Sequence, residues 1–187
     1  MTYPIALVGE AWGEEEERQR IPFVGPSGKL LNSLLKSAGI NRHECFLTNV
    51  FNLKPKPTND IANLCGPRSE AIPNRPPVGN KKYIRAEYAP ELDRLDRELE
   101  EANPNIIVCL GGTAAWAVLG SSQITKVRGT VAVTSRGVKA IATYHPAAVL
   151  RQWELRATTI YDLIKARRES ADRAFNRPQR QIWIEPS

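Results

Sequence analysis

Four side chains of this 187-residue chain could act together on a small planar ligand: Glu10, Phe23, Asn49 and His145. Glu10 and Asn49 lie at the ends of apolar runs that predict buried strands, and His145 closes a third such run. Phe23 lies on the loop beyond the first run. Open α/β sheets bind ligands at the carboxyl ends of their strands, so we expect these four residues to converge at one edge.

The chemistry of this set suits a nucleobase. The ring of Phe23 could stack on the face of the base, and the carboxamide of Asn49 offers a donor and an acceptor to an imide or lactam edge. The imidazole of His145 could donate to an oxygen that gains charge. The carboxylate of Glu10 could orient a water or stabilise a developing cation. Together they have the equipment to break the N-glycosidic bond of a flipped nucleotide.

Each residue also has a structural interpretation. Glu10 begins an acidic stretch that extends to Glu17 and could be a solvated face. Phe23 could belong to the core, and Asn49 could cap a turn. His145 precedes a proline and could be purely structural. The joint placement at strand ends favours a site over four unrelated roles.

Strands and helices alternate around these residues. Gly9 ends the first apolar strand, Ile5–Val8, and Ser27 is the expected N-cap of a leucine-rich helix that ends at Gly39. The other predicted elements are strands at Glu44–Val50, Ile106–Leu110, Val131–Val133 and Ala140–Thr143, and helices at Ile84–Ala102, Thr113–Leu119 and Glu154–Phe175. This order predicts a three-layer α/β/α sandwich with a central, mostly parallel sheet of four to five strands.

The remaining segments define the domain organisation. Residues Leu53 to Gly79 are rich in Pro, Asn and Gly and predict a long ordered loop, a kind of segment that is often functional. We expect a single domain over residues 1–176 and a C-terminal tail over residues 177–187.

Composition narrows the class of protein. The chain has 26 basic and 20 acidic residues, which fits a nucleic-acid partner but is shared by many soluble proteins. The start MTYPIALVGE does not read as a signal peptide, and no apolar run reaches membrane-spanning length, so we expect a cytoplasmic monomer without a membrane partner. Cys45, Cys65 and Cys109 form no CxxC pair, which argues against a zinc site or a disulfide framework. Cys45 and Cys109 are predicted to be buried thiols.

A family resemblance strengthens the chemical interpretation. The segment GEAWGEEEERQRIPFVGPSGKLLNSLLKSAGI resembles the family 4 uracil-DNA glycosylases, whose pattern is GEAPG, a short acidic stretch, PFVG and a leucine-rich helix. The resemblance continues through LTNV at 47–50, IIVCLGGTA at 106–114, RGT at 128–130 and HPAAVLR at 145–151. These motifs span residues 5–163 and occur in the same order as in the family.

The resemblance implies a role for each residue of the set. Glu10 would take the place of the catalytic acid and position or activate the water. Phe23 would stack on the base, Asn49 would read the uracil edge, and His145 would contact O2 and stabilise the departing uracilate. The same motifs imply three further base-binding residues, Gly9 and Ala11 through their backbone amides and Glu16 as a guard of the C5 side.

The resemblance also implies that one surface of the protein binds DNA that contains uracil. HPAAVLR is similar to the intercalation loop of the family, so Leu150 would fill the vacated stack and Arg151 would bind a phosphate. We expect three more basic residues beside the motifs to bind phosphates if they lie on the same face: Lys54, Lys56 and Arg128.

Two departures from the family pattern matter. Family 4 members carry a four-cysteine iron–sulfur cluster, but no CxxC precedes the first strand here, and Leu53 and Tyr88 occupy the positions of the later cysteines. We therefore expect no metal and no cofactor. The proline of GEAPG is Trp12, which could pack in the core, narrow the pocket, or stack on a neighbouring base. Of these roles, we expect one that faces the pocket or the DNA.

The missing ligands and the ending RQIWIEPS resemble phage-borne glycosylase domains found with DNA polymerases, so a DNA polymerase is a further expected partner.

Three functions compete. The first is a monofunctional glycosylase that removes uracil or a related modified pyrimidine in base excision repair. The second is an inactive module that binds DNA or a polymerase, which has no physical need for Glu10, Asn49 and His145 together. The third is a nucleotide-handling protein with a phosphate at Cys109–Thr113, but GxGxxG and GxxxxGK[ST] are absent.

Overall fold

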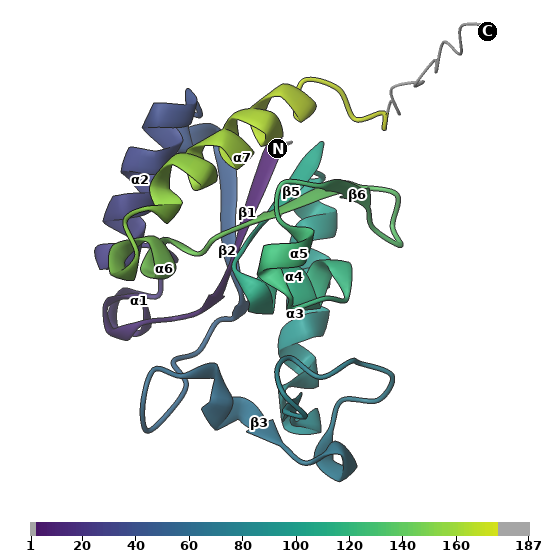
Figure 1. The fold of residues 1–187 in the computed structure, drawn as a ribbon. Helices are drawn as coiled ribbons and strands as arrows, with labels where there is room; N and C mark the ends of the chain where they lie inside the picture. Colours follow the sequence, from purple (N-terminus) through teal and green to yellow (C-terminus); the bar gives the residue numbers. More distant parts are fainter. Residues whose placement is uncertain (1–2, 176–187) are drawn as a thin grey trace, which may run out of the picture.

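The computed structural model describes residues 3–175 and has a five-stranded central sheet (Figure 1). The strand order is β2-β1-β5-β7-β6, in which β6 runs antiparallel to β7 and the other neighbours are parallel. The strands are β1 (Ile5–Ala11), β2 (Cys45–Phe51), β5 (Ile106–Leu110), β6 (Val131–Val133) and β7 (Lys139–Thr143). The predicted mostly parallel sheet is confirmed.

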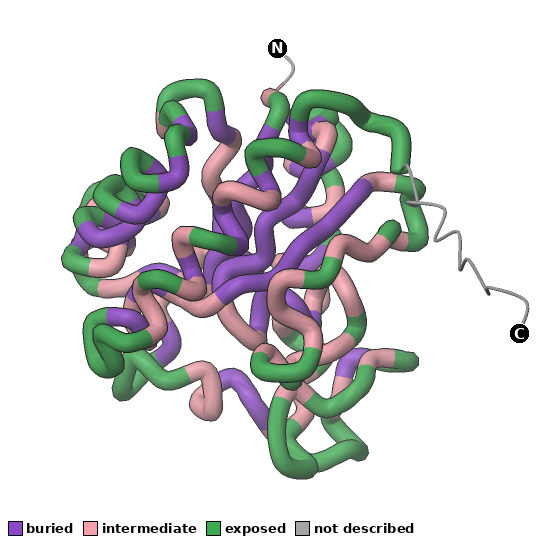
Figure 2. Tube along the Cα trace, turned by 45° about the horizontal axis from the view of Figure 1, so that its top comes forward, coloured by how far each residue is buried: buried purple, intermediate pink, exposed green. Residues whose placement is uncertain are grey.

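Both faces of the sheet are buried. Along β1, Ile5 and Leu7 belong to one core cluster and Ala6 and Val8 to the other, as the two-residue repeat of a strand requires. Such continuous apolar strands are typical of parallel sheets that helices cover on both sides. Figure 2 shows these buried strands at the centre and the exposed residues on the surrounding helices and loops.

Helices complete the two outer layers. The first layer contains α2 (Pro26–Ala38), α6 (Pro146–Arg151) and α7 (Leu155–Glu169), and the second contains α3 (Ala89–Ala102), α4 (Gly112–Leu119) and α5 (Ile124–Val127). Leu31, Leu34 and Leu35 of α2 are buried against one face, and Trp116 of α4 is fully buried against the other. This is the predicted three-layer sandwich.

Several predicted helix boundaries are wrong. Gly25 is the N-cap of α2 and Pro26 lies in its first turn, so Ser27 is already helical. The acidic stretch forms a helix of its own, α1 (Glu14–Gln19). The helix expected from Ile84 begins at Ala89, because β4 (Tyr83–Ile84) pairs with β3 (Cys65–Gly66). The terminal helix ends at Glu169, and the predicted tail at 177–187 lies outside the described residues.

The Pro-rich loop is ordered by packing and hydrogen bonds. It contains β3 and two 3₁₀ turns, at Ile61–Leu64 and Arg68–Glu70. It is bound to α4 at two points: Trp116 Nε1 donates to Pro76 O at 2.7 Å, and the Arg75 side chain donates to Ala117 O at 3.0 Å.

Among residues 3–175, no helix is both long and apolar enough to cross a bilayer. Cys45 and Cys109 are buried free thiols, as predicted.

Candidate active site

The carboxyl edge of the sheet brings together Glu10, Phe23, Asn49 and His145. Gly9 and Asn49 are partners in the β1–β2 register, and Glu10 follows Gly9 on β1. A Cβ atom on Gly9 would lie 2.2 Å from Asn49 Oδ1 and 2.5 Å from Phe23 Cζ. Glycine is therefore needed at position 9 so that the carboxamide and the aromatic ring can both reach the strand end.

Phe23 is held in an uncommon backbone conformation. Its φ is +58°, a left-handed value that non-glycine residues rarely adopt. Glu16 accepts hydrogen bonds from the backbone N–H groups of Val24 (3.0 Å) and Gly25 (2.8 Å), and Arg42 donates to Phe23 O at 3.1 Å. Such strain persists only where the surroundings enforce it, and it concentrates at functional sites. Glu16 thus orders the loop that carries the ring, and its C5-guarding role stays a prediction.

His145 has one defined tautomer. It is the N-cap of α6, where its Nδ1 accepts a hydrogen bond from the N–H of Ala147 at 3.1 Å. Burial, together with the positive charge of Arg151, lowers the pKa of His145 to about 4, against an opposing effect of Glu16. The imidazole is therefore neutral near pH 7, and its proton is on Nε2. A neutral N–H donor next to the Phe23 ring, at 6.2 Å between centroids, can stabilise an oxygen that gains negative charge.

Glu10 is bound to a residue that sequence analysis missed. Thr113, in the first turn of α4, donates from Oγ1 to Glu10 Oε2 at 2.5 Å. Burial raises the pKa of the Glu10 carboxyl, the Thr113 hydrogen bond opposes this, and Asp60 and Arg151 have smaller effects of opposite sign. The bond occupies one carboxylate oxygen, so the other can accept a hydrogen bond from water. The GGT run at the start of a helix after a buried strand was the only sequence signal for Thr113.

Asn49 is fixed by its backbone while its side-chain amide is available. Arg94 of α3 donates to Asn49 O at 2.8 Å and to Val50 O at 3.0 Å, which fixes the end of β2. Asn49 is only 2% exposed, and its Nδ2 has no hydrogen-bond partner within residues 3–175. A buried donor without a partner destabilises the fold by about 1–3 kcal/mol, which favours a site for a ligand acceptor. Arg94 was also missed; its only signal was its spacing from Glu91 and Glu98 on one helix face.

Leu150 and Arg151 lie at the end of α6, the helix that His145 caps. Leu150 is 50% exposed, and the charge of Arg151 affects the pKa of both His145 and Glu10. These two predicted DNA-binding residues are therefore next to the site. Ala11, the last residue of β1, lies on the same edge.

Lys54 and Lys56 lie beside α1. Lys54 Nζ is 3.6 Å from Glu14 and Lys56 Nζ is 3.2 Å from Glu17. Lys56 is largely exposed, so its ion pair is weak and can be exchanged for a phosphate. Both lysines remain predicted DNA contacts on the loop that follows β2.

Arg128, the fourth basic residue predicted to bind a phosphate, is bound to a buried carboxylate. Its Nε lies 3.0 Å from Asp162 Oδ2 and its Nη2 lies 2.5 Å from Asp162 Oδ1. Asp162 is 1% exposed and also accepts a hydrogen bond from Thr143 at 2.7 Å. The arginine is thus the counter-ion of a buried carboxylate that links α7 to β7, and its contact with DNA stays a prediction.

We expect Arg128→Ala to lower the free energy of unfolding by about 3–5 kcal/mol, because it leaves Asp162 buried without its cation. Urea unfolding measures this loss. Arg151→Ala is the matched control: it should preserve stability and reduce the salt dependence of DNA binding by about one phosphate contact. If Arg128→Ala instead weakened DNA binding at unchanged stability, the assignment of the two arginines would be reversed.

Trp12 is buried, which contradicts the DNA-facing alternative of its expected role. The side chain is 7% exposed, its backbone N–H donates to Leu53 O at 3.1 Å, and the Arg20 guanidinium lies 5.8 Å from the ring centroid. Its Nε1 has no hydrogen-bond partner in the described part of the chain. Trp12 comes two residues after Glu10, and its expected role of narrowing the base pocket stays a prediction.

We expect Trp12→Ala to destabilise the protein by about 3–5 kcal/mol, as for other buried tryptophans. Trp12→Phe should lose far less, since it keeps an aromatic ring and removes the unsatisfied N–H. Thermal melting of both variants, with excision of uracil and 5-substituted uracils, checks this. Equal stability of Trp12→Ala and the wild type would contradict the buried position.

The described residues do not include a set of ligands for an iron–sulfur cluster. Leu53 and Tyr88 pack against an apolar core, where Tyr88 lies 6.3 Å from the ring of Phe51. Cys65 is buried and donates its S–H to Ile61 O at 3.4 Å. Residues 3–175 contain no group of three or more His, Cys, Asp and Glu side chains that could hold a metal. Apolar packing thus takes the place that the family 4 pattern gives to cysteine.

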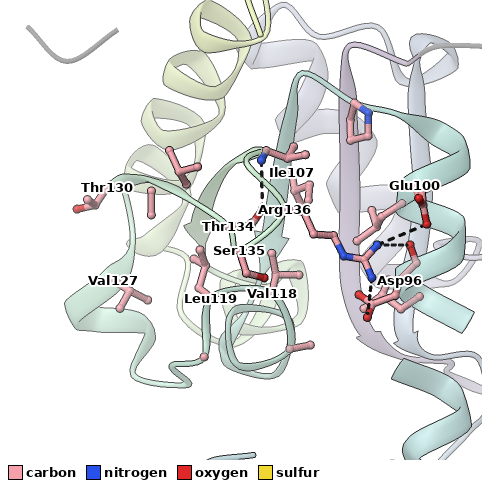
Figure 3. Close-up of a pocket in the computed structure, with 18 of the residues that line it drawn as sticks. Asp96, Glu100, Ile107, Val118, Leu119, Val127, Thr130, Thr134, Ser135 and Arg136 are labelled. Atoms are coloured by element: carbon pink, nitrogen blue, oxygen red, sulfur yellow. Dashed lines mark hydrogen bonds and ion pairs between the residues drawn. The ribbon is translucent and has the colours of Figure 1, made fainter. Parts of the chain in front are cut away.

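A groove of about 1040 Å³ lies elsewhere, between α3, α4 and the β6 hairpin. Figure 3 shows Arg136 of this groove reaching Asp96 and Glu100 of α3. The groove is lined by residues of these elements, such as Leu99, Val118 and Ala132, and its lining does not include Glu10, Asn49 or His145.

Comparison with known proteins agrees with the site geometry. The family model of the uracil DNA glycosylase superfamily matches residues 2–168. The type-4 uracil-DNA glycosylase of Archaeoglobus fulgidus is 37% identical over 164 residues, which cover 81% of this chain and 69% of that protein. The type-4 enzyme of Thermotoga maritima is 36% identical over 167 residues, 87% of this chain and 76% of that protein. That of Sulfurisphaera tokodaii is 36% identical over 172 residues, 87% of this chain and 68% of that protein.

Proposed function

Because this chain belongs to the uracil DNA glycosylase superfamily, we propose that it flips uracil out of DNA and hydrolyses the N-glycosidic bond, as a monofunctional enzyme of base excision repair. The observation that carries this proposal is the convergence of Glu10, Asn49 and His145 on one strand edge, with a free amide donor on Asn49 and a neutral imidazole.

Recognition of uracil uses two groups. The Phe23 ring stacks on the flipped base. The Nδ2 of Asn49 donates to O4, and its Oδ1 accepts from N3–H, as the donor and acceptor of a carboxamide allow. Cytosine would present an amino group to Nδ2 and leave two donors facing each other, which rejects it.

Bond breaking separates charge. As the C1′–N1 bond breaks, its electron pair goes to uracil, and the Nε2–H of His145 donates to O2 of the departing anion. Positive charge develops on the sugar, where the Glu10 carboxylate stabilises it. A water then attacks C1′ and Glu10 accepts its proton, which leaves an abasic sugar and an intact DNA strand.

The DNA contacts follow from the same placement. Leu150 fills the space that the flipped base vacates, and Arg151 binds a phosphate beside it. A related modified pyrimidine as substrate, a DNA polymerase as partner, a monomeric state, a cytoplasmic location and a single domain over residues 1–176 remain predictions. An inactive binding module is not favoured, because it needs neither the raised pKa of Glu10 nor the neutral His145.

Chromatography of the free base tests the proposal. A uracil-containing oligonucleotide should release uracil, and an otherwise identical thymine oligonucleotide should release nothing. Binding of the uracil oligonucleotide without release of uracil would support the inactive module instead.

A further inference from the structure

Six large apolar side chains are exposed within residues 3–175, and three of them lie on the two segments that carry Phe23 and His145 or directly follow them. Ile21 precedes the Phe23 loop, and Leu150 lies at the end of α6. Trp153, which is 60% exposed, comes three residues after Leu150 and lies in the link between α6 and α7. Apolar groups that gather beside a site mark a contact surface, whereas isolated ones do not.

The Trp153 ring is fixed on the surface. The Arg156 guanidinium carbon lies 5.5 Å from the ring centroid, and the Nη2 of the same arginine donates to Ser37 Oγ of α2 at 3.3 Å. The N–H of Arg156 also donates to Trp153 O at 3.0 Å. An arginine on one side of an indole leaves the other face for a second planar group, and the anchored arginine keeps that face in place.

The ring lies within reach of DNA that occupies the site. His145 caps the start of α6, and this six-residue helix rises about 9 Å to Arg151, just before the ring. Two further residues add at most about 8 Å, so the backbone of Trp153 lies within about 17 Å of His145, the length of about five stacked nucleotides. Arg151 and Arg156 flank it with positive charge.

These observations identify the chemistry of the occupant. In duplex DNA both faces of each base are covered by its neighbours, so a surface ring can stack there only if the base stack is first opened, whereas the base faces of an unpaired strand are available without that cost. Aromatic rings beside basic residues are how proteins hold single-stranded DNA. A charged groove alone would not distinguish the two forms of DNA.

We propose that Trp153 stacks on an unpaired base near the flipped uracil and gives this protein a preference for single-stranded DNA. The stacking itself needs only DNA, and the preference for uracil in single strands rests on the function proposed above.

The test compares Trp153→Ala with Tyr161→Ala. Tyr161 is a matched control, because it is also an exposed aromatic residue, 69% exposed, on α7. Fluorescence anisotropy at constant salt measures the dissociation constants for a uracil-free single strand and for the same sequence as a duplex. Using DNA without uracil separates this test from the proposed function, since binding is measured where no base can be excised.

Trp153→Ala should weaken single-strand binding by about 10-fold and duplex binding by less than about 2-fold, while Tyr161→Ala changes neither. Trp153→Phe should recover most of the affinity, since it keeps an aromatic face. With saturating uracil-containing DNA, single-turnover release by Trp153→Ala should equal that of the wild type. Equal losses for both forms of DNA, or no loss for either, would overturn the proposal, and the second result would assign the ring to a protein contact. If the wild type released no uracil but single-strand binding still depended on Trp153, only the function proposed above would fail.

Discussion

Replacing Glu10 by glutamine should lower the single-turnover rate of uracil release by about 10²–10⁴-fold, the usual contribution of a positioned acid or base. Glutamine keeps the size of the side chain and a hydrogen-bond partner for Thr113, but it cannot accept the proton of water or stabilise positive charge on the sugar. DNA affinity should stay within about twofold, because the carboxylate acts in the transition state rather than in the bound ground state. Unchanged release by Glu10→Gln would remove Glu10 from the reaction.

The pH dependence of the rate shows whether the ionised or the protonated form of Glu10 is active. The active form is the carboxylate, so the rate should rise with pH and level off above the raised pKa of Glu10. The Thr113 hydrogen bond lowers this pKa, so Thr113→Val should move the rising limb to higher pH. A rate that falls as pH rises through this range would mean that the protonated acid is the active form.

Stability provides the control for Glu10→Gln. The folded protein holds the Glu10 proton more tightly than the unfolded chain, so ionisation of Glu10 lowers the free energy of unfolding as pH rises toward the folded pKa. Glutamine lacks this effect, and we expect Glu10→Gln to melt at the same temperature as the wild type or higher at about pH 8. Lost activity in a protein of equal stability therefore reports on chemistry.

Removing the imidazole of His145 should slow uracil release by about 10²–10³-fold, the effect of deleting one oxyanion donor. His145→Asn is a sharper variant than His145→Ala, because asparagine can still cap α6 by accepting from Ala147 N–H while it lacks the Nε2 donor. Alanine should also lose about 0.5–2 kcal/mol of stability, the value of an N-cap. The two variants separate the catalytic role from the structural one.

The low pKa of His145 makes a second measurement possible. With a pKa of about 4, the imidazole is neutral throughout the range in which histidine usually titrates. An unperturbed histidine titrates near 6.5, so a contribution of ordinary histidine ionisation would appear between about pH 6 and pH 7. We expect none from His145, so the rates of the wild type and of His145→Asn should depend on pH in the same way over this range. A wild-type rate that falls across that range, and no longer falls in His145→Asn, would show that the imidazolium is the active form.

Sequence could locate the residues that follow apolar strands. Glu10, Asn49 and His145 each end such a run, and parallel strands bring their carboxyl ends together without further information. Phe23 could be placed only on the loop beyond the first strand, because nothing in its local pattern predicts a left-handed aromatic residue held by Glu16.

The missed residues depend on contacts between distant parts of the chain. Thr113 is 103 residues from Glu10, and Arg94 is 45 residues from Asn49. The same limit explains Arg128, which a basic motif marks as a DNA contact although Asp162, 34 residues away, binds it. Trp12 was misplaced because small neighbours indicated too little material to bury it, whereas the ring is covered in the fold.

Alkaline cleavage of an end-labelled oligonucleotide that contains one uracil tests the central claim most directly. The wild-type protein should leave the strand intact until alkali is added, and alkali should then break it only at the uracil position, because an abasic sugar is alkali-labile. Glu10→Gln, at the same occupancy of DNA, should give almost no break in the same time. A strand that the wild-type protein binds and that stays intact after alkali would contradict the proposed glycosylase.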